Sequence, residues 1–259
     1  MDDFVQKLKL QRDGSAIQNI TNPSEELQLI AVKQHGSAIQ YIKEPSEEVQ
    51  LAAVKRTLCA FEYIKKPFEK VQLAVVNEKG RMIRFIYKPS EKIKLAAVKQ
   101  NGFAIEFISC MSEEVKFAAV KQNGLAIEYI EDPSKKVKLA AVKQNGLAIE
   151  HIDDPSEELK LVAVKQNGLT IQCIDNPSEE MKLLAVKQNG STIEFIDNPS
   201  EEVQLASLWD PIARNYVVVG LELPTIHYKW IHDKISSDVK YFKKNLLNVK
   251  KYSDIKFIY

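Results

Sequence analysis

The sequence predicts an all-α fold, an α-solenoid of about ten two-helix repeats closed by a nonrepetitive helical cap. Three observations predict it: prolines recur every 22 residues, glycines recur with the same period, and the residues between them carry apolar side chains at helical spacing. A unit of 22 residues is too short to bury an apolar face alone, so its helices must stack on the neighbouring units. The predicted repeat domain spans residues 1–220, and residues 221–259 form the predicted cap.

Proline and glycine define the repeat because almost all of them fall on the period. Each unit is numbered from its proline, and the ten units begin at residues 1, 23, 45, 67, 89, 111, 133, 155, 177 and 199. The period omits one proline, where Met111 stands, and one glycine, where Leu58 stands. The consensus unit is PSEEVQLAAVKQNGLAIEYIED.

The first helix of each unit is predicted to begin at the proline. The residue before it is Asn or Asp in five units, which suits an N-cap, and Glu follows two residues later. Glycine at repeat position 14, usually after Asn, is expected to adopt the left-handed conformation that ends a helix of about 12 residues.

The second helix of each unit is predicted over repeat positions 15–21, as about two turns that are either α or partly 3₁₀, and the next proline ends it. The first helix has apolar residues on two sides, at positions 5, 8 and 9 and at positions 7 and 10, so we expect neighbouring units to cover both sides. The aromatic residues at position 19, beside isoleucines at positions 17 and 20, are interpreted as core.

The phrase VQLAAVKQNGLAIEYI resembles two kinds of short helical repeat. One is the leucine-rich-variant repeat, and the other is an uncharacterised repeat of a domain of unknown function found in some viruses, phages and microbes. The resemblance covers units 2 to 9, although the period of 22 is slightly shorter than in either family. It implies a curved helical stack used as a binding surface, and it carries over no catalytic residue.

No catalytic or metal site is indicated by the sequence. His35 and His151 are far apart in the chain, and His227 and His232 are five residues apart, so they do not share a helical face as metal ligands would. The three cysteines form neither an even set nor a CxxC pair, and motifs for phosphate binding or a nucleophilic serine are absent. We therefore expect a protein that is not an enzyme and holds no cofactor or metal.

Composition excludes a membrane span and names no partner. Basic residues number 36 and acidic residues 35, so the net charge of +1 gives no overall positive field of the kind most nucleic-acid binders carry. No apolar run is long enough to cross a membrane, and the polar N-terminus lacks the features of a signal peptide. We expect a cytoplasmic protein, with its oligomeric state left open.

Units 3 to 5 depart most from the consensus. Arg, Tyr and Phe, which are favoured in binding hot spots, replace consensus residues there. These departures are either a partner's footprint or the result of sequence drift. The candidate residues are Arg56, Phe68, Asn77, Arg81, Arg84 and Tyr87.

Lysine occupies repeat position 11 in seven units. The row either follows an acidic partner or neutralises the glutamates at positions 3, 4 and 18. The candidate binding residues of the row are Lys99, Lys121, Lys143, Lys165 and Lys187.

The C-terminal tail is basic and aromatic. Residues 209–259 hold nine basic and five acidic side chains, a balance of +4. The predicted helix over 238–251 has lysines opposite an apolar side, so it either caps the last repeat or binds an anionic partner. The candidate residues are Tyr228, Trp230, Lys240, Lys243 and Lys244.

Together these observations favour a nonenzymatic scaffold that binds a protein through its curved surface. The resemblance to viral and phage repeats adds the more specific hypothesis of an inhibitor that blocks a host or immune protein. The alternative is a solenoid that binds nucleic acid through its lysine rows and basic tail, which predicts steeply salt-dependent binding.

Overall fold

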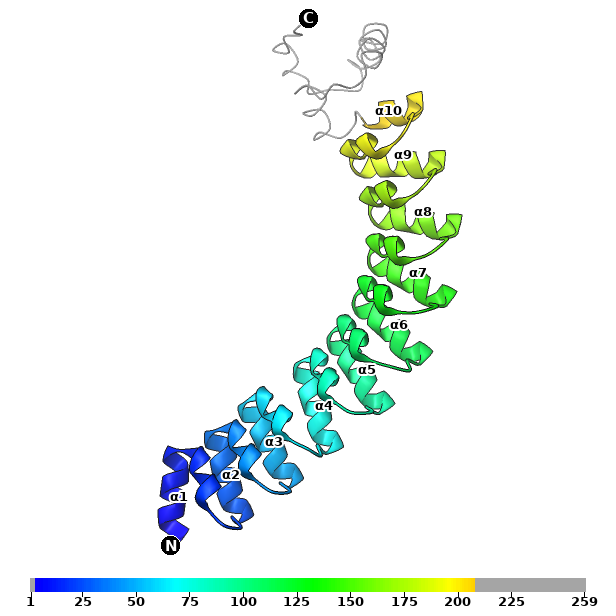
Figure 1. The fold of residues 1–259 in the computed structure, drawn as a ribbon. Helices are drawn as coiled ribbons and strands as arrows, with labels where there is room; N and C mark the ends of the chain where they lie inside the picture. Colours follow the sequence, from blue (N-terminus) through cyan, green and yellow to red (C-terminus); the bar gives the residue numbers. More distant parts are fainter. Residues whose placement is uncertain (1–2, 208–259) are drawn as a thin grey trace, which may run out of the picture.

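The computed structural model describes residues 3–207, in which ten α-helices alternate with nine 3₁₀ helices (Figure 1). The α-helices are α1 (Asp3–Arg12), α2 (Glu25–Gln34), α3 (Glu47–Arg56), α4 (Glu69–Glu78), α5 (Glu91–Gln100), α6 (Glu113–Gln122), α7 (Lys135–Gln144), α8 (Glu157–Gln166), α9 (Glu179–Gln188) and α10 (Glu201–Ser207). The 3₁₀ helices are η1 (Gly14–Asn19), η2 (Gly36–Tyr41), η3 (Leu58–Tyr63), η4 (Gly80–Phe85), η5 (Gly102–Phe107), η6 (Gly124–Tyr129), η7 (Gly146–His151), η8 (Gly168–Cys173) and η9 (Gly190–Phe195).

The helices form an α-solenoid, as the period predicts. Successive α-helices lie side by side along a curved arc, and each unit packs on the units before and after it (Figure 1). Residues 3–207 contain no β-strand, and none of their helices is long and apolar enough to cross a membrane. The predicted cap at 221–259 lies outside the described residues.

The α-helices begin two residues later than predicted. Serine at repeat position 2 is the N-cap of every helix from α2 to α9 except α4. In each of these except α5 its hydroxyl accepts a hydrogen bond from the backbone N–H three residues on, as Ser112 does from Val115 at 3.2 Å. The Asn or Asp before the proline cannot cap, because it has a left-handed backbone: φ is 51° at Asn22 and 46° at Asp132. Helices α2 to α9 therefore have 10 residues, at repeat positions 3–12.

Contrary to the prediction, the glycine at position 14 does not have a left-handed backbone. It is required because a side chain there would collide with the next unit. A Cβ at Gly124 would lie 2.4 Å from the carbonyl oxygen of Ala141 in the next unit, and one at Gly14 would lie 2.3 Å from that of Ala31. The α-helix ends because position 13 is extended, and its Asn starts the 3₁₀ helix: Asn123 Oδ1 accepts from the Leu125 N–H at 3.1 Å.

The core lies between the layer of α-helices and the layer of 3₁₀ helices. It is built from repeat positions 5, 9 and 10 of the α-helix and positions 16, 17 and 20 of the second helix and its end. In unit 6 these residues are at most 6% exposed: Val115, Ala119, Val120, Ala126, Ile127 and Ile130. Positions 7 and 8 are half-buried on the outer side of the α-helices, so the predicted pairing of positions 5, 8 and 9 against 7 and 10 is wrong.

Candidate binding surfaces

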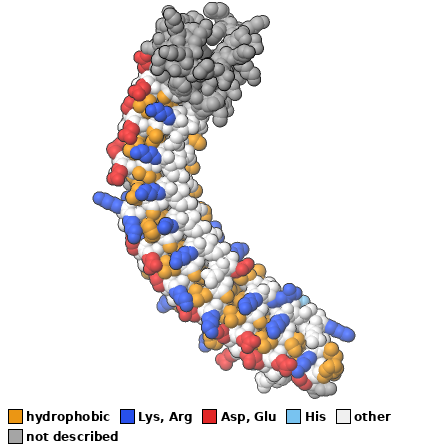
Figure 2. Space-filling model, turned by 180° about the vertical axis from the view of Figure 1, so that it is seen from behind, with side chains coloured by type: hydrophobic (Ala, Val, Ile, Leu, Met, Phe, Trp, Pro, Cys, Tyr) orange, Lys and Arg blue, Asp and Glu red, His pale blue; other side chains and the backbone are white. Residues whose placement is uncertain are grey.

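The outward side of the α-helices, called here the α-face, carries repeat positions 4, 7, 8 and 11. These positions share one helical stripe, turned away from the buried positions 5, 9 and 10. Leu or Phe at position 7 is half-buried in every unit from α2 to α9, as at Leu95 and Leu139. Figure 2 shows basic side chains at regular spacing along the array, with apolar ones between them and acidic ones along the convex edge.

The lysines of position 11 lie exposed on the α-face, and none of them forms an ion pair with a carboxylate among the described residues. One interpretation of the row is that its lysines neutralise the glutamates at positions 3, 4 and 18. In residues 3–207 these lysines and glutamates form no ion pairs with one another. The row consists of Lys33, Lys55, Lys99, Lys121, Lys143, Lys165 and Lys187.

The lysines of position 6 have a different place. Lys94 Nζ donates to the carbonyl oxygen of Cys110 at 2.8 Å, and Lys116 Nζ donates to that of Glu131 at 3.0 Å. These bonds join one unit to the loop that enters the next. Lys94 and Lys116 therefore contribute to stacking, whereas no lysine at position 11 in residues 3–207 forms such a contact with the next unit.

A shallow hollow of roughly 550 Å³ lies between α4 and α5 on the α-face. Asn77 stands where seven other units have lysine, and it lines the hollow together with Lys99 of the next unit. Leu73 and Leu95 also line it. The hollow thus combines apolar side chains with one of the unpaired lysines.

The outward side of the 3₁₀ helices, called here the η-face, carries the aromatic residues of position 19. The interpretation of these residues as core is wrong for four of them, because Tyr41, Tyr63, Phe85 and Phe195 are 40–48% exposed. A 3₁₀ helix places positions 16 and 17 inward, and only one of its sides can face the core. Position 19 lies at the edge of this buried side, so its aromatic rings stay partly exposed.

Three candidate residues of unit 4 lie on the η-face and not with the lysines. Arg81 forms an ion pair with Glu106 at 2.8 Å and stacks on Phe107 with 5.0 Å to the ring centroid. Arg84 stacks on Phe85 at 4.5 Å, and Tyr87 is 86% exposed. The candidates of units 3 to 5 are thus divided between opposite faces of the array.

The junction between units 3 and 4 differs from all the other described junctions. Elsewhere each 3₁₀ helix packs on the next α-helix and the next 3₁₀ helix, but η3 makes at most marginal contact with α4 and η4. Leu58 replaces the glycine that close stacking requires. Units 3 and 4 remain in contact near the start of α4. There the buried Gln50 side chain donates to the carbonyl oxygen of Lys66 at 3.2 Å and accepts from the Phe68 N–H at 3.2 Å.

Glutamine at position 12 joins the five junctions between units 4 and 9. Gln100 Oε1 accepts from the Gly80 N–H at 2.7 Å, and its Nε2 donates to the carbonyl oxygen of Glu78 at 3.1 Å. At the junction of units 3 and 4 this position holds Glu78, whose carboxylate has no N–H to donate. The role of this glutamine was not predicted, although its recurrence at position 12 of units 5 to 9 is visible in the sequence.

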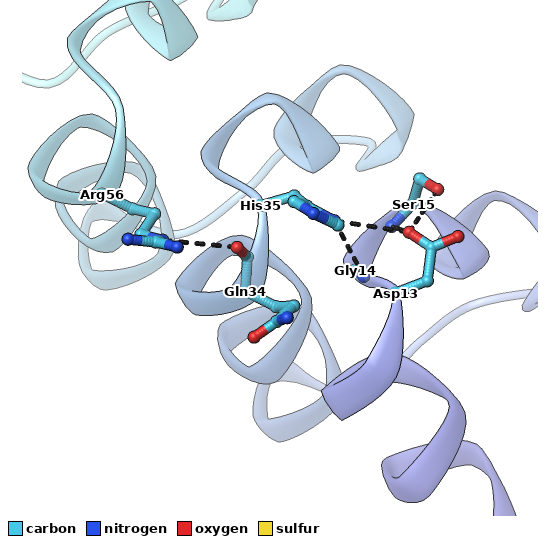
Figure 3. A network of polar contacts seen from close by, with 6 residues as sticks. All are labelled: Asp13, Gly14, Ser15, Gln34, His35 and Arg56. Atoms are coloured by element: carbon cyan, nitrogen blue, oxygen red, sulfur yellow. Dashed lines mark hydrogen bonds and ion pairs between the residues drawn. The ribbon is translucent and has the colours of Figure 1, made fainter.

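At the first two junctions other residues make the contacts between units: His35 at the first, although Gln34 stands at position 12, and Arg56 at the second (Figure 3). His35 Nδ1 accepts from the Gly14 N–H at 3.2 Å and lies 3.3 Å from Asp13 Oδ1, while Arg56 Nε donates to the carbonyl oxygen of Gln34 at 3.3 Å. Hydrogen bonds from the Ser15 hydroxyl and backbone N–H lower the pKa of the Asp13 carboxyl. Arg56 therefore has a structural contact between units, and a role in partner binding stays a prediction.

No group of three or more potential metal ligands occurs in residues 3–207. Burial, together with the hydrogen bond from Sγ to Glu150, raises the pKa of the Cys173 thiol to about 12, which disfavours the reactive thiolate at neutral pH. Phe68 is 47% exposed at the start of α4. The tail candidates Tyr228, Trp230, Lys240, Lys243 and Lys244 lie outside the described residues.

Comparison with known proteins gives one partial match. A family model described as a domain of unknown function (DUF4116) matches residues 90–133, a stretch that corresponds to units 5 and 6. Comparison with curated proteins and with solved structures finds no match. The match covers two of the repeats, and a family described only as a domain of unknown function assigns them no role.

Proposed function

We propose that this chain is a nonenzymatic scaffold that binds an acidic, partly apolar segment of another protein on its α-face. The observation that carries the proposal is the row of exposed lysines at position 11, which have no carboxylate partner among the described residues and stand beside half-buried leucines. Lysines left unpaired along seven units are available to acidic groups of a partner. The leucines between them add apolar area that a protein segment can cover.

A protein suits this face better than a nucleic acid does. Adjacent α-helices are about 8–10 Å apart, so the lysines stand wider apart than successive phosphates of a strand. Exposed glutamates at position 4 lie on the same stripe, as at Glu114 and Glu158, and would repel a phosphate backbone along its whole length, whereas a protein segment can place neutral residues beside them. Aromatic platforms for stacked bases are nearly absent from this stripe in residues 3–207, where Phe117 is the exception.

The inhibitor hypothesis is a narrower form of the same proposal. A repeat array that covers an acidic surface of an enzyme would block it without any chemistry of its own. The resemblance of the repeats to those of viruses and phages supports this form, and the compartment in which it would act stays a prediction.

The test uses defined probes and a charge-reversal variant. The probes are a fluorescein-labelled amphipathic peptide of Glu and Leu, the same peptide with Gln in place of Glu, and a thymidine 20-mer. We expect the acidic peptide to bind most tightly in fluorescence anisotropy at physiological salt. The triple variant Lys99→Glu, Lys121→Glu, Lys143→Glu should weaken its binding by a factor of about 10 or more, since each lost pair contributes ~0.2–1 kcal/mol and each reversal adds repulsion.

The matched control reverses three exposed lysines elsewhere, with Lys43→Glu, Lys65→Glu and Lys135→Glu. It changes the net charge equally and should leave the affinity for the peptide unchanged. Equal binding of the acidic and Gln peptides would contradict the proposal. Tighter binding of the thymidine 20-mer, lost in the triple variant, would move the function to nucleic acid.

A further inference from the structure

The η-face contains a contact that shows what one of its recurring pairs can bind. The Arg81 guanidinium at repeat position 15 reaches into the next unit, where it pairs with Glu106 at 2.8 Å and stacks on Phe107 at 5.0 Å. Glu106 and Phe107 are neighbours at positions 18 and 19. A carboxylate beside an aromatic ring thus holds one guanidinium by charge and by a cation–π contact.

The same pair recurs in units whose neighbour supplies no arginine. Glu62–Tyr63, Glu128–Tyr129 and Glu194–Phe195 occupy positions 18 and 19 of units 3, 6 and 9. In unit 6 the place of the guanidinium is taken by Phe103, whose ring meets Tyr129 edge-on with centroids 6.2 Å apart. In unit 9 the preceding unit places Leu169 at position 15.

In unit 3 no side chain at position 15 of the preceding unit covers the pair Glu62 and Tyr63. The preceding residue at position 15 is Ser37, whose side chain is too short to reach across to the next unit. Tyr63 is 48% exposed, and Glu62 is exposed and has no cationic partner among residues 3–207. On the other side η3 makes at most marginal contact with α4 and η4, so an approaching chain is not blocked there.

We propose that Glu62 and Tyr63 form a docking site for an arginine side chain of an extended partner segment. Arginine fits better than lysine because its planar guanidinium both pairs with a carboxylate and stacks on a ring, as Arg81 does in unit 5. The site lies on the opposite layer from the lysine row and has the opposite charge. It is therefore independent of the surface that carries the proposed function.

The contact of Arg81 with Glu106 and Phe107 suggests two opposite substitutions, one that closes the proposed site and one that opens a second site. Ser37→Arg should supply the missing guanidinium from within the chain and close the site, although it changes neither Glu62 nor Tyr63. Arg81→Ser should open the equivalent site at Glu106 and Phe107. The probe is a fluorescein-labelled Gly/Ser peptide with two arginines, compared with its citrulline and lysine versions by fluorescence anisotropy.

We expect the arginine peptide to bind several-fold more tightly than the citrulline or lysine peptide. Glu62→Gln and Ser37→Arg should each weaken it by a factor of about 5, as loss of one exposed ion pair with its cation–π contact implies. Arg81→Ser should strengthen it by a factor of at most about 2, because it adds one equivalent site. Glu114→Gln, which removes an exposed carboxylate of the α-face, is the control and should have no effect.

Two outcomes would overturn the proposal. One is unchanged affinity in both Glu62→Gln and Ser37→Arg, and the other is equal binding of the citrulline peptide, whose side chain is neutral. The acidic peptide used for the lysine row should bind the Glu62, Ser37 and Arg81 variants equally, since none of these residues lies on the α-face. A failure at Glu62 and Tyr63 is thus distinguishable from a failure of the proposed function.

Discussion

At the residue scale, two repeat positions have roles other than those predicted. Glycine at position 14 is expected from sequence to supply a left-handed backbone, but its hydrogen atoms leave room for a carbonyl oxygen of the next unit. The residue before the proline, expected to be an N-cap, is the left-handed one in seven units, and so is Cys110 before Met111. Asn and Asp tolerate this conformation better than other non-glycine residues, which explains why they are frequent there.

One pair of substitutions distinguishes the two roles. We expect Gly124→Ala to lower the free energy of unfolding by about 1–3 kcal/mol, because its Cβ would lie 2.4 Å from the Ala141 oxygen and force two units apart. Asp132→Gly should change it by less than about 1 kcal/mol, since glycine adopts a φ of 46° without strain. Urea denaturation followed by circular dichroism measures both. A larger loss at Asp132 than at Gly124 would contradict this assignment.

The residues that join the units were only partly predictable. The serine at position 2 and the glutamine at position 12 recur in the sequence as plainly as the lysine at position 11 does. Their functions depend on which atoms face one another across a junction, such as Gln166 Oε1 and the Gly146 N–H at 2.7 Å. A period alone gives no such pairing. Likewise, that the lysines of position 11 form no ion pair follows only from the positions of all described carboxylates, which a period does not give.

At the element scale, a junction is held at two ends. The glycine and glutamine close the end near the 3₁₀ helices, and contacts at the start of the α-helices close the other: Ser46 donates to Glu25, and Ser134 donates to Glu113. Between units 3 and 4 only the second end is closed, by Gln50 and by an ion pair of Lys70 with Glu47 at 2.8 Å. The omission of glycine at Leu58 is visible in the sequence, but its effect on stacking follows only from the carbonyl contact.

Two substitutions should close this junction. Leu58→Gly restores the close approach, and Glu78→Gln restores the amide that bonds to the preceding unit. We expect the double variant to have a changed curvature, seen as a shift in the pair-distance distribution from small-angle X-ray scattering. Glu78→Gln alone is the control and should have little effect, because the Leu58 side chain still separates the units. An unchanged distribution in the double variant would show that other residues hold the junction open.

At the scale of the whole molecule, the two layers present different rows of charged residues to solvent, although the glutamates of position 4 share the α-face with the lysines. Unpaired lysines recur along the α-face, while glutamates recur beside aromatic rings on the η-face. The net charge of +1 conceals this separation, so whole-chain electrostatics could not name a binding surface. The solenoid form, by contrast, was predictable, because stacking requires every unit to repeat the same apolar positions.

The stability of such an array is a sum of terms for each unit and each junction, so a weak junction divides it. Residues 3–66 hold three units on one side of the open junction, and a body of this size is marginal on its own. We expect hydrogen exchange with mass spectrometry to show lower, uniform protection over residues 3–66 than over units 5 to 8, with the step between α3 and α4. Leu58→Gly with Glu78→Gln should raise the protection of residues 3–66 toward that of units 5 to 8, because opening the first three units would then also break the restored contacts. Protection that falls gradually along the array, with no step at this junction, would mean that the remaining contacts of Gln50 and Lys70 transmit stability as well as an intact junction does.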